Sequence, residues 1–579
     1  MRWLVRAIGS DGTLPVACTS AGQDDDENAG VPTQSATGAS DHNEPNRGGR
    51  RLTVQPSAGP RQSMTIPTSN LAHLLIQTAR RFPDRPALVW RNDTWTWAGF
   101  RDRVQAAAAA LSAQGVRHGD RVLLHARNGN AVLETMFTTW MIGATWVPTN
   151  FRLTPPEVAY LAQSSGAAVH IFDSAFPEHA AAAKAENPAC RLEVWIGEGS
   201  PNWESLATHA TRAEVPADVD RDHPAWFFYT SGTTGRPKAG VLTHGQLEYV
   251  VCNHLCDLMP GTTEQDASLV VAPLSHGAGI HALPQIARGA VTVLLPSEKL
   301  DCEEAWRLVE KHRVTNMFTV PTILTMLTRH ESVDRYDHSS LRYVIYAGAP
   351  MYRADQVHAL RKLGKVIVQY FGLGEVTGNI TVLPPHLHSE DDAGMPVGSC
   401  GFPRTGMDVA ILDDQGQRLP AGTTGEICVR GPGVFAGYHD NPDATAKAFV
   451  HGWFHTGDLG HMDERGFVYI TGRASDMYIS GGSNIYPREI EEVLLTHPAV
   501  VEACVVGMPH EKWGESGTAV LVLEQDAQVT SPEMLAHLEG KLAKYKWPER
   551  FVVWPELPKS GYGKVTKREV KRLLQEDIR

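Results

Sequence analysis

The sequence predicts an α/β fold: a large N-terminal domain of layered α/β subdomains plus a β-rich subdomain, with a small mobile α+β C-terminal domain. Three observations lead to this prediction. The chain has 579 residues, 42% apolar and 20% charged, which is enough for several packed cores. Short apolar runs alternate with longer amphipathic ones, a pattern typical of largely parallel sheets. After about residue 405 the pattern becomes β-rich, and mixed α/β returns near residue 476.

The beginning of the chain differs from the rest. Residues 1–65 are rich in Gly, Ser, Asn, Asp, Pro and Arg and show no periodicity, which predicts a disordered N-terminal extension. The first helix is predicted just after Ser69 and Asn70, which can cap it. Because Met64 precedes this helix, we hypothesise that residues 1–63 are an upstream translation artefact, which the N-terminal mass of the native protein tests.

The elements of the chain body follow from apolar periodicity. Strands are predicted at residues 87–90, 122–124, 225–229, 291–295, 314–320, 341–346, 501–506 and 518–523. Helical spacing is found over 104–111, in an apolar run over 134–146, along a stripe over 247–258 and around 490–494. Turns are predicted at 413–416, 421–425 and 463–466.

Charge and cysteine content exclude several classes of protein. Lys and Arg total 53 against 65 Asp and Glu, a formal charge of −12, which argues against a general nucleic acid binder. The eight cysteines are scattered, which favours buried thiols in a reducing compartment. Cys252, His254 and Cys256 are predicted to pack in the core rather than to bind zinc. With no convincing leader and no run of ~20 apolar residues, a cytoplasmic location is predicted.

The clearest site signal is the segment from Tyr229 to Lys238. Its predicted phosphate-binding residues are Thr230, Ser231, Gly232, Thr233, Thr234, Gly235 and Lys238. Small residues let backbone N–H groups approach an anion, the hydroxyls add donors, and the lysine adds positive charge. The segment therefore predicts a polyphosphate cradle, although its spacing is not that of the P-loop of common NTPases.

Six segments, in the same order, resemble the motifs of the adenylate-forming superfamily of acyl-CoA synthetases, adenylation domains and luciferases. They are residues 229–240, 273–279, 369–375, 453–459, 472–489 and 558–564, and the resemblance extends from about residue 70 to the end. It implies an ATP-dependent enzyme that joins a carboxylic acid to AMP, releases pyrophosphate and then transfers the acyl group to CoA. The domains it implies are a large AMP-binding domain over 66–471, a hinge over 472–476 and a small domain over 477–579.

The resemblance also assigns roles around the nucleotide. Lys564 would contact the carboxylate and the α-phosphate, and Glu375 with Thr230 would hold Mg²⁺. Asp458 and Arg473 would bind the ribose. Gly348, Ala349 and Pro350 would lie on the adenine side, and the further residues assigned to nucleotide or phosphate binding are Gln369, Tyr370, Phe371 and Gly372.

The acid and the thiol are assigned in the same way. The residues of the implied acyl pocket are His276, Gly277 and Gly279. This segment lacks the aspartate of amino-acid-activating relatives, and its small residues leave room, so we expect a fatty or other hydrophobic acid; an aryl acid or a dicarboxylate stays open. Gly481 and Gly482 would line the CoA tunnel, and Ser475 would be the hinge residue. The expected partners are the acid, ATP, Mg²⁺ and CoA, without nucleic acid, and the oligomeric state, with a homodimer as one option, is left open.

Two alternatives to an acyl-CoA synthetase stay open, and departures from the family pattern motivate the second of them. The family usually has Tyr-Gly-x-Thr-Glu where residues 371–375 are Phe-Gly-Leu-Gly-Glu, and the two lost hydroxyls imply a weaker hold on the nucleotide. Ser475 replaces the usual Lys or Asp of the hinge. The alternatives are an enzyme that loads a carrier protein and a catalytically weak nucleotide-binding relative. The His and acidic residues of 386–392 are predicted to form a solvated loop rather than a metal site.

Overall fold

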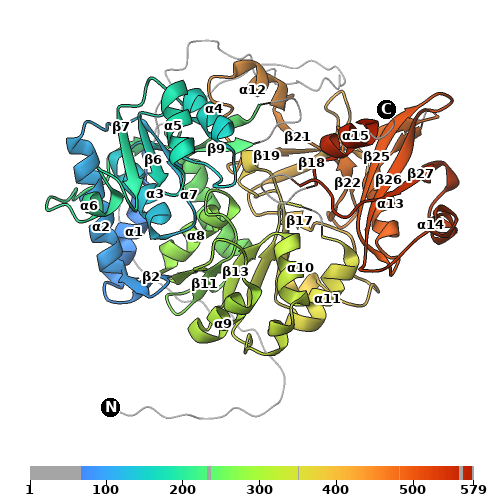
Figure 1. Cartoon of the computed structure of the whole chain (residues 1–579), viewed down its shortest axis with the longest axis horizontal. Coiled ribbons are helices and arrows are strands. Elements are labelled where there is room, and N and C mark those ends of the chain that lie inside the picture. The colour runs from blue at the N-terminus through green and yellow to red at the C-terminus, as the bar shows by residue number, and fades with distance from the viewer. Residues whose placement is uncertain (1–66, 231–235, 350, 482, 560–564, 577–579) are drawn as a thin grey trace, which may run out of the picture. The chain divides into compact units, whose positions relative to one another are not determined.

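The computed structural model describes residues 67–230, 236–349, 351–481, 483–559 and 565–576 (Figure 1). The disordered extension predicted over 1–65 and the hypothesis about residues 1–63 both concern residues outside the described ranges. Within the described ranges the strands form five sheets, of which the smallest pairs β1 (Pro67–Thr68) with β8 (Val219–Asp220). The predicted α/β class is confirmed.

A six-stranded sheet with the order β10-β9-β5-β4-β6-β7 occupies the first part of the chain. Its strands are β4 (Arg121–His125), β5 (Thr145–Pro148), β6 (Val169–Asp173), β7 (Leu192–Ile196), β9 (Pro224–Thr230) and β10 (Lys238–Thr243). The helices of this part are α2 (Trp97–Ala113), α3 (Asn130–Ile142), α4 (Pro155–Ser165), α5 (Pro177–Glu186) and α6 (Trp203–Ala207). Neighbouring strands are parallel except in the β9–β10 hairpin. Trp146 and Trp226 meet edge to face across β5 and β9, with 4.6 Å between their centroids, and fill the core.

The apolar run over 134–146 contains two elements rather than one. Helix α3 ends at Gly143, which has the left-handed conformation (φ 74°), and β5 begins two residues later. The run reads as continuous because helix and strand are both buried, so that apolar residues occur on every side. A single glycine with positive φ supplies the break.

A nine-stranded sheet forms the second layer, in the order β17-β16-β15-β14-β13-β11-β12-β2-β3. Its strands are β2 (Pro86–Trp90), β3 (Asp93–Thr96), β11 (Ala267–Val270), β12 (Val291–Leu294), β13 (Asn316–Thr319), β14 (Tyr343–Tyr346), β15 (Ile367–Phe371), β16 (Thr381–Leu383) and β17 (Phe402–Pro403). The associated helices are α1 (Ala72–Arg81), α7 (His244–Asn253), α8 (Gly277–Arg288), α9 (Cys302–His312), α10 (Pro321–Arg329) and α11 (Arg353–Leu363). The strands from β2 to β15 along this order are parallel, as the sequence predicts. At the start of α1, Asn70 Oδ1 accepts a hydrogen bond from the backbone of Ala72 (2.9 Å), so the predicted cap is partly confirmed.

The β-rich part and the C-terminal part each contain a five-stranded sheet. The first consists of β18 (Asp408–Leu412), β19 (Gly425–Arg430), β20 (Phe449–Val450), β21 (Trp453–Met462) and β22 (Val468–Arg473), with α12 (Pro442–Ala448). The second consists of β23 (Tyr478–Ser480), β24 (Ser483–Ile485), β25 (Val500–His510), β26 (Gly514–Leu523) and β27 (Arg550–Val553), with α13 (Pro487–Leu494), α14 (Ser531–Leu538) and α15 (Lys567–Glu576). The strands predicted at 501–506 and 518–523 are confirmed, but both are longer than their apolar cores.

Two minor predictions need correction. Cys252 and Cys256 are exposed, and only His254 is buried, because α7 continues into a π turn (His254–Leu258) that places the two thiols on its outer side. In the loop over 386–392, Glu390 and Asp392 form ion pairs with arginines of α11, whereas His388 is buried. That loop is therefore only partly solvated.

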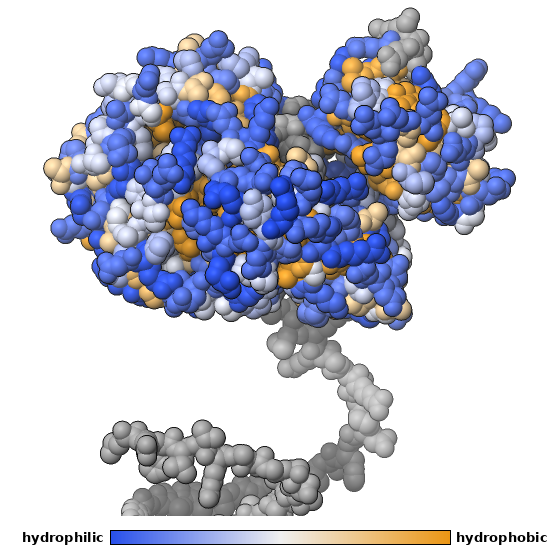
Figure 2. Space-filling model, turned by 60° about the horizontal axis from the view of Figure 1, so that its bottom comes forward, coloured by the Kyte–Doolittle hydropathy of each residue, from blue (hydrophilic) through white to orange (hydrophobic). Residues whose placement is uncertain are grey.

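The described surface is mostly polar. In the face drawn in Figure 2, hydrophilic residues predominate and hydrophobic residues form small groups between them. Among the described helices, none combines the length and the apolar character that a bilayer crossing requires. The cytoplasmic location stays a prediction.

Candidate active site

The predicted phosphate loop joins the two strands of a hairpin. Strand β9 ends at Thr230 and β10 begins at Lys238, and these two residues are paired across the hairpin. The sequence indicated a strand before the loop and a helical stripe after it, and β10 between them was missed. Residues Ser231, Gly232, Thr233, Thr234 and Gly235 lie outside the described residues. The hairpin fixes both ends of the loop, so its two described phosphate-binding residues face each other.

Glu375 joins the two large sheets. It lies in a 3-10 turn (Gly374–Val376) just after β15, and its carboxylate is buried. Its Oε1 accepts hydrogen bonds from Thr230 Oγ1 (2.8 Å) and from the hydroxyl of Tyr438 (3.0 Å). The structure therefore brings together the two residues predicted to hold Mg²⁺. Mg²⁺ prefers oxygen ligands, and a carboxylate and a hydroxyl both provide them. Glu375 and Thr230 therefore suit a Mg²⁺ site.

Tyr438 is a site residue that the sequence did not reveal. Burial and the Glu375 carboxylate raise the pKa of Tyr438 above its ordinary range, so its hydroxyl stays protonated and donates to that carboxylate. Its ring lies 5.2 Å from Lys238 Nζ, a cation–π distance. Tyr438 thus orients both the Glu375 carboxylate and the Lys238 side chain. It lies in an irregular segment outside every apolar run, and no local pattern marks it.

The residues assigned to the adenine side and to the rest of the nucleotide lie at the ends of two adjacent parallel strands or directly after them. Strands β14 and β15 pair Tyr346 with Gln369, and the Tyr346 hydroxyl donates to Gln369 Oε1 (3.1 Å). Gly348 follows β14 and has φ 82°. Gly372 follows β15, and a Cβ on Gly372 would lie 2.3 Å from the Cα of Gly378. Both glycines are required by the backbone. Ala349 is described beside Gly348, whereas Pro350 lies outside the described residues.

The residues assigned to ribose face each other in the β-rich sheet. Asp458 of β21 and Arg473 of β22 are paired across these strands, and Arg473 Nε donates to Asp458 Oδ1 (3.0 Å). Asp458 is 5% exposed. Because the aspartate is buried and the arginine half-exposed, this pair can present hydrogen-bonding groups to a ligand from a fixed position.

Glu426 holds the segment that carries Asp458, and the sequence did not reveal it. Its Oε1 accepts from the backbone N–H of Gly457 (2.9 Å), and its Oε2 accepts from His455 Nδ1 (2.7 Å). Gly457 has φ 73°. Cys428 Sγ lies 3.5 Å from the same His455 nitrogen, and burial raises the pKa of Cys428 to about 12, so this thiol is protonated. Glu426 therefore fixes the backbone of strand β21 just before Asp458.

The acyl segment differs from the expectation in one respect. Helix α8 begins at Gly277, but the space beside its glycines is filled: a Cβ on Gly277 would lie 2.5 Å from Phe318 Cζ, and one on Gly279 would lie 2.1 Å from the carbonyl oxygen of Leu274. The glycines permit close packing, so the expectation that small residues leave room for the acid here is wrong. His276 contacts Phe228, with 4.9 Å between the ring centroids.

Phe228 also explains the departure from the family pattern at Gly374. A Cβ at Gly374 would lie 2.6 Å from Phe228 Cδ1 and Cε1, and 2.9 Å from Thr230 Cγ2. The aromatic ring occupies the space that a threonine side chain would need. The two residues are therefore mutually compensating.

Ser475, predicted for the hinge, and Gly481, predicted for the CoA tunnel, lie in turns. Ser475 Oγ donates to Asp476 Oδ1 (3.2 Å), and the backbone N–H of Asp476 donates to the carbonyl of Arg473 (3.0 Å). Gly481 has φ 56°, and its N–H donates to the carbonyl of Trp513 (2.9 Å). Gly482 and Lys564 lie outside the described residues.

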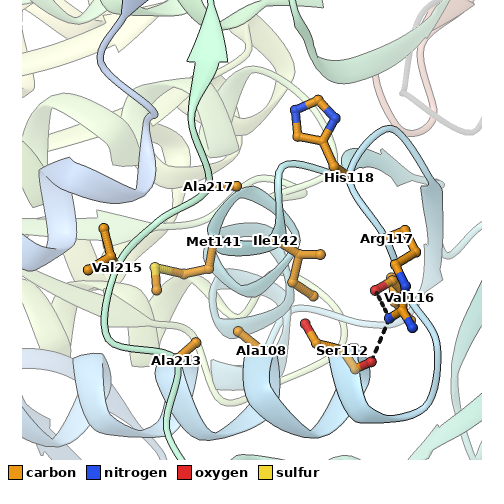
Figure 3. A pocket seen from close by; sticks show the side chains of 10 residues that line it. All are labelled: Ala108, Ser112, Val116, Arg117, His118, Met141, Ile142, Ala213, Val215 and Ala217. Atoms are coloured by element: carbon orange, nitrogen blue, oxygen red, sulfur yellow. Dashed lines mark hydrogen bonds between the residues drawn. The ribbon is translucent and has the colours of Figure 1, made fainter.

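One cavity lies apart from all of these residues (Figure 3). It has a volume of about 310 Å³ and lies between α2, α3 and the segment over 213–217. Its lining consists of Ala108, Ser112, Val116, Arg117, His118, Met141, Ile142, Ala213, Val215 and Ala217. The Arg117 guanidinium is hydrogen-bonded to the carbonyls of Ser112 and Val116.

The fold and the paired site residues define a class, the AMP-forming ligases, and comparison with known proteins identifies the family. The model of the AMP-binding enzyme family matches residues 75–439, and that of the AMP-binding enzyme C-terminal domain matches residues 489–564. The chain belongs to this family, within the adenylate-forming superfamily that the motifs indicated. The expected use of ATP is confirmed with it.

The relatives share most of the chain. A feruloyl-CoA synthase of an Amycolatopsis species is 38% identical over 500 residues, which cover 86% of this chain and 97% of that protein. The o-succinylbenzoate CoA synthetase of Bacillus subtilis, solved with its acyl-adenylate intermediate, has a TM-score of 0.76, 31% identity and coverage of 87% and 98%. ATP-bound MatB of Rhodopseudomonas palustris has a TM-score of 0.79, 30% identity and coverage of 88% and 100%.

Proposed function

We propose that the protein is an ATP-dependent acyl-CoA synthetase for a hydrophobic carboxylic acid. The observation that carries this proposal is the hydrogen-bonded group of Glu375, Thr230 and Tyr438 at the ends of the phosphate hairpin. The Glu375 carboxylate and the Thr230 hydroxyl suit Mg²⁺, and Lys238 beside Tyr438 suits a phosphate. Several relatives are named as ligases or synthetases that form CoA thioesters.

The first half-reaction joins the acid to AMP. A carboxylate oxygen of the acid attacks the α-phosphorus of ATP, the new O–P bond forms, and the bond to the β-phosphate breaks with loss of pyrophosphate. Because an anion approaches a polyanion, catalysis consists mainly of charge neutralisation and positioning. Lys238 and Lys564 supply positive charge, and Asp458 accepts hydrogen bonds from the ribose. Mg²⁺ held by Glu375 and Thr230 would offset charge on the phosphate oxygens.

The second half-reaction makes the thioester. The sulfur of CoA attacks the carbonyl carbon of the acyl-adenylate, the thiol proton passes to solvent, and the C–O bond to AMP breaks. The small domain over 477–579 would turn about the hinge at 472–476, which removes Lys564 and brings Gly481 and Gly482 to the pantetheine arm. Engineered cysteines that crosslink the two domains should block thioester synthesis, and full synthesis in the crosslinked enzyme would contradict this step.

Aromatic side chains support the choice of acid. His276 and Phe228 are in contact, and Phe318 packs against the first turn of α8. Such surfaces suit an uncharged aryl or alkyl chain. A panel of fatty, aryl and dicarboxylic acids, assayed for pyrophosphate release with ATP, tests the proposal. Release with hydrophobic acids supports it, and silence across the panel despite ATP binding would favour a nucleotide-binding protein.

A carrier protein is the second candidate for the acyl acceptor. One relative, 33% identical over 505 residues, is named a fatty acid–acyl-carrier-protein ligase from Streptomyces coeruleorubidus. The assay therefore compares CoA with a phosphopantetheinylated carrier protein at equal thiol concentration. Mass spectrometry of the thioester product decides between them.

A further inference from the structure

Arg404 is buried without the hydrogen bonds that its side chain needs. It lies between β17 and β18, and its side chain has no exposed surface. Its Nε and Nη1 have no hydrogen-bond partner among the residues that the structure describes. Burial lowers the pKa of Arg404 to about 10, so the guanidinium is still charged at neutral pH. A buried cation with free donors is costly, and the site lacks an acceptor.

The neighbouring carboxylate does not supply that acceptor. Asp257 Oδ2 lies 3.7 Å from Arg404 Nε, which is an ion-pair distance but too long for a hydrogen bond. The Asp257 oxygens already accept from the backbone N–H of Thr405 (2.8 Å), from its hydroxyl (2.9 Å) and from Asn253 Nδ2 (3.0 Å). Asp257 therefore balances the charge and leaves the donors of Arg404 unused.

The neighbouring histidine does not supply it either. His254 Nδ1 lies 3.3 Å from Arg404 Nη2 and 3.0 Å from the carbonyl oxygen of Val250. When Nδ1 carries the proton and donates to this carbonyl, it cannot accept from the arginine, and in neither tautomer does this contact serve Nε or Nη1 of Arg404. Burial, with Arg404 close by, holds the pKa of His254 well below its ordinary value, so the ring is neutral. This histidine begins the π turn of α7, a type of turn frequent at functional sites.

A continuous row of aromatic rings leads from the implied acyl pocket to Arg404. Phe318 packs on Gly277 of α8. The ring of Tyr370 stacks on Phe318 (6.0 Å between centroids, 26° between planes) and lies 6.4 Å from the ring of His254. His254 Nδ1 in turn lies 3.3 Å from Arg404 Nη2, so the row of rings ends at the guanidinium. An acid whose carboxylate reacts near the start of α8 would extend along these rings toward the guanidinium.

We propose that Arg404 recognises an oxygen acceptor at the far end of the carboxylic acid, and so determines which acids the enzyme activates. This inference rests on the proposed function and deepens it. The acceptor is a hydroxyl, a methoxyl or a second carboxylate, which share the ability to receive a hydrogen bond from a guanidinium. The acid is otherwise apolar, because Phe318 and Tyr370 border its path.

The test compares acids that differ only at the far end. The full chain is assayed for pyrophosphate release with 3-phenylpropenoic acid and its 4-hydroxy, 4-methoxy and 4-carboxy derivatives. At least one derivative should exceed the parent acid in kcat/KM by about 10- to 100-fold, as expected for a hydrogen bond to a charged group. The four arms show which oxygen group is preferred. Equal kcat/KM for all four acids would overturn the inference.

Variants connect that preference to Arg404. In Arg404→Met the ratio of the preferred derivative to the parent acid should fall to about one, and in Arg404→Lys part of it should remain. Arg418→Met, which removes an exposed arginine of the β-rich part, is the control and should keep the wild-type ratio. A wild-type ratio in Arg404→Met would mean that water satisfies the guanidinium, and the inference would be wrong.

Two further measurements keep the outcomes distinct. AMP-dependent thermal stabilisation shows whether each variant is folded. If Arg404→Met is not folded, the kcat/KM ratios of the wild type and of Arg404→Lys still test the inference. Calorimetric titration of the same four acids in the presence of AMP measures the preference without turnover. Turnover without preference contradicts only this inference, whereas preferential binding without pyrophosphate release contradicts only the proposed function.

Discussion

Two carboxylates, the buried Glu375 and the half-buried Glu426, accept two hydrogen bonds each, but from different kinds of donor. Glu375 is held by the hydroxyls of Thr230 and Tyr438, which can rotate away. Glu426 is held by the backbone N–H of Gly457 and by the His455 ring, which are fixed by strand β21. A carboxylate with rotatable donors can exchange them for a metal ion, whereas one with fixed donors maintains local geometry. We therefore interpret Glu375 as a ligand of Mg²⁺ and Glu426 as a residue that positions Asp458.

The largest effect is expected from Glu375→Gln. The change keeps the shape of the side chain but removes the charge that a metal ion needs, so kcat/KM for adenylation should fall by about 10²- to 10³-fold. The Mg²⁺ concentration for half-maximal rate should also rise. Pyrophosphate release measured across a Mg²⁺ titration checks both effects. An unchanged Mg²⁺ dependence would contradict the role as a ligand and erase the contrast with Glu426.

The next effect concerns Gly374, the neighbour of the ligand carboxylate. Gly374→Thr forces a side chain against Phe228 and should lower the free energy of unfolding by about 1–3 kcal/mol. The double variant Phe228→Leu/Gly374→Thr should recover part of that loss, because the leucine lacks the ring edge that the threonine meets. Denaturant unfolding of both single variants and the double variant gives the coupling free energy. Strict additivity would show that the two residues do not compensate each other.

Glu426→Gln should have a smaller and different effect. The amide can still accept from Gly457 but loses charge toward His455, so Asp458 is held less firmly. We expect KM for ATP to rise about 10-fold, with kcat changed less. Steady-state kinetics at saturating acid measure the split between the two constants. The Mg²⁺ titration serves as the control, since a shift like that of Glu375→Gln would mean that both acids bind the ion.

The sequence predicts one of these carboxylates and not the other, for a physical reason. Glu375 belongs to a contiguous motif at the end of a parallel strand, where the motif and the strand both appear as local patterns. Glu426, Tyr438 and Arg404 act through residues 29 to 150 positions away in the chain, which only folding brings close. Strands such as those over 225–229, 291–295 and 341–346 were predictable because burial imposes a period on neighbouring residues, whereas β10 was missed. Contacts between distant segments impose none.

The smallest effect is expected from Tyr438→Phe, which removes one of the two rotatable donors of Glu375 but keeps the ring beside Lys238. Losing one hydrogen bond is worth about 0.5–1.5 kcal/mol, so kcat/KM should fall by only about 2- to 10-fold. Without this competing donor, the carboxylate should bind Mg²⁺ at a lower concentration than in the wild type, the reverse of Glu375→Gln. The Mg²⁺ titration under the same conditions measures that shift. A higher Mg²⁺ requirement would instead mean that the tyrosine hydroxyl itself helps to hold the ion, and the distinction between exchangeable donors and ligands at Glu375 would fail.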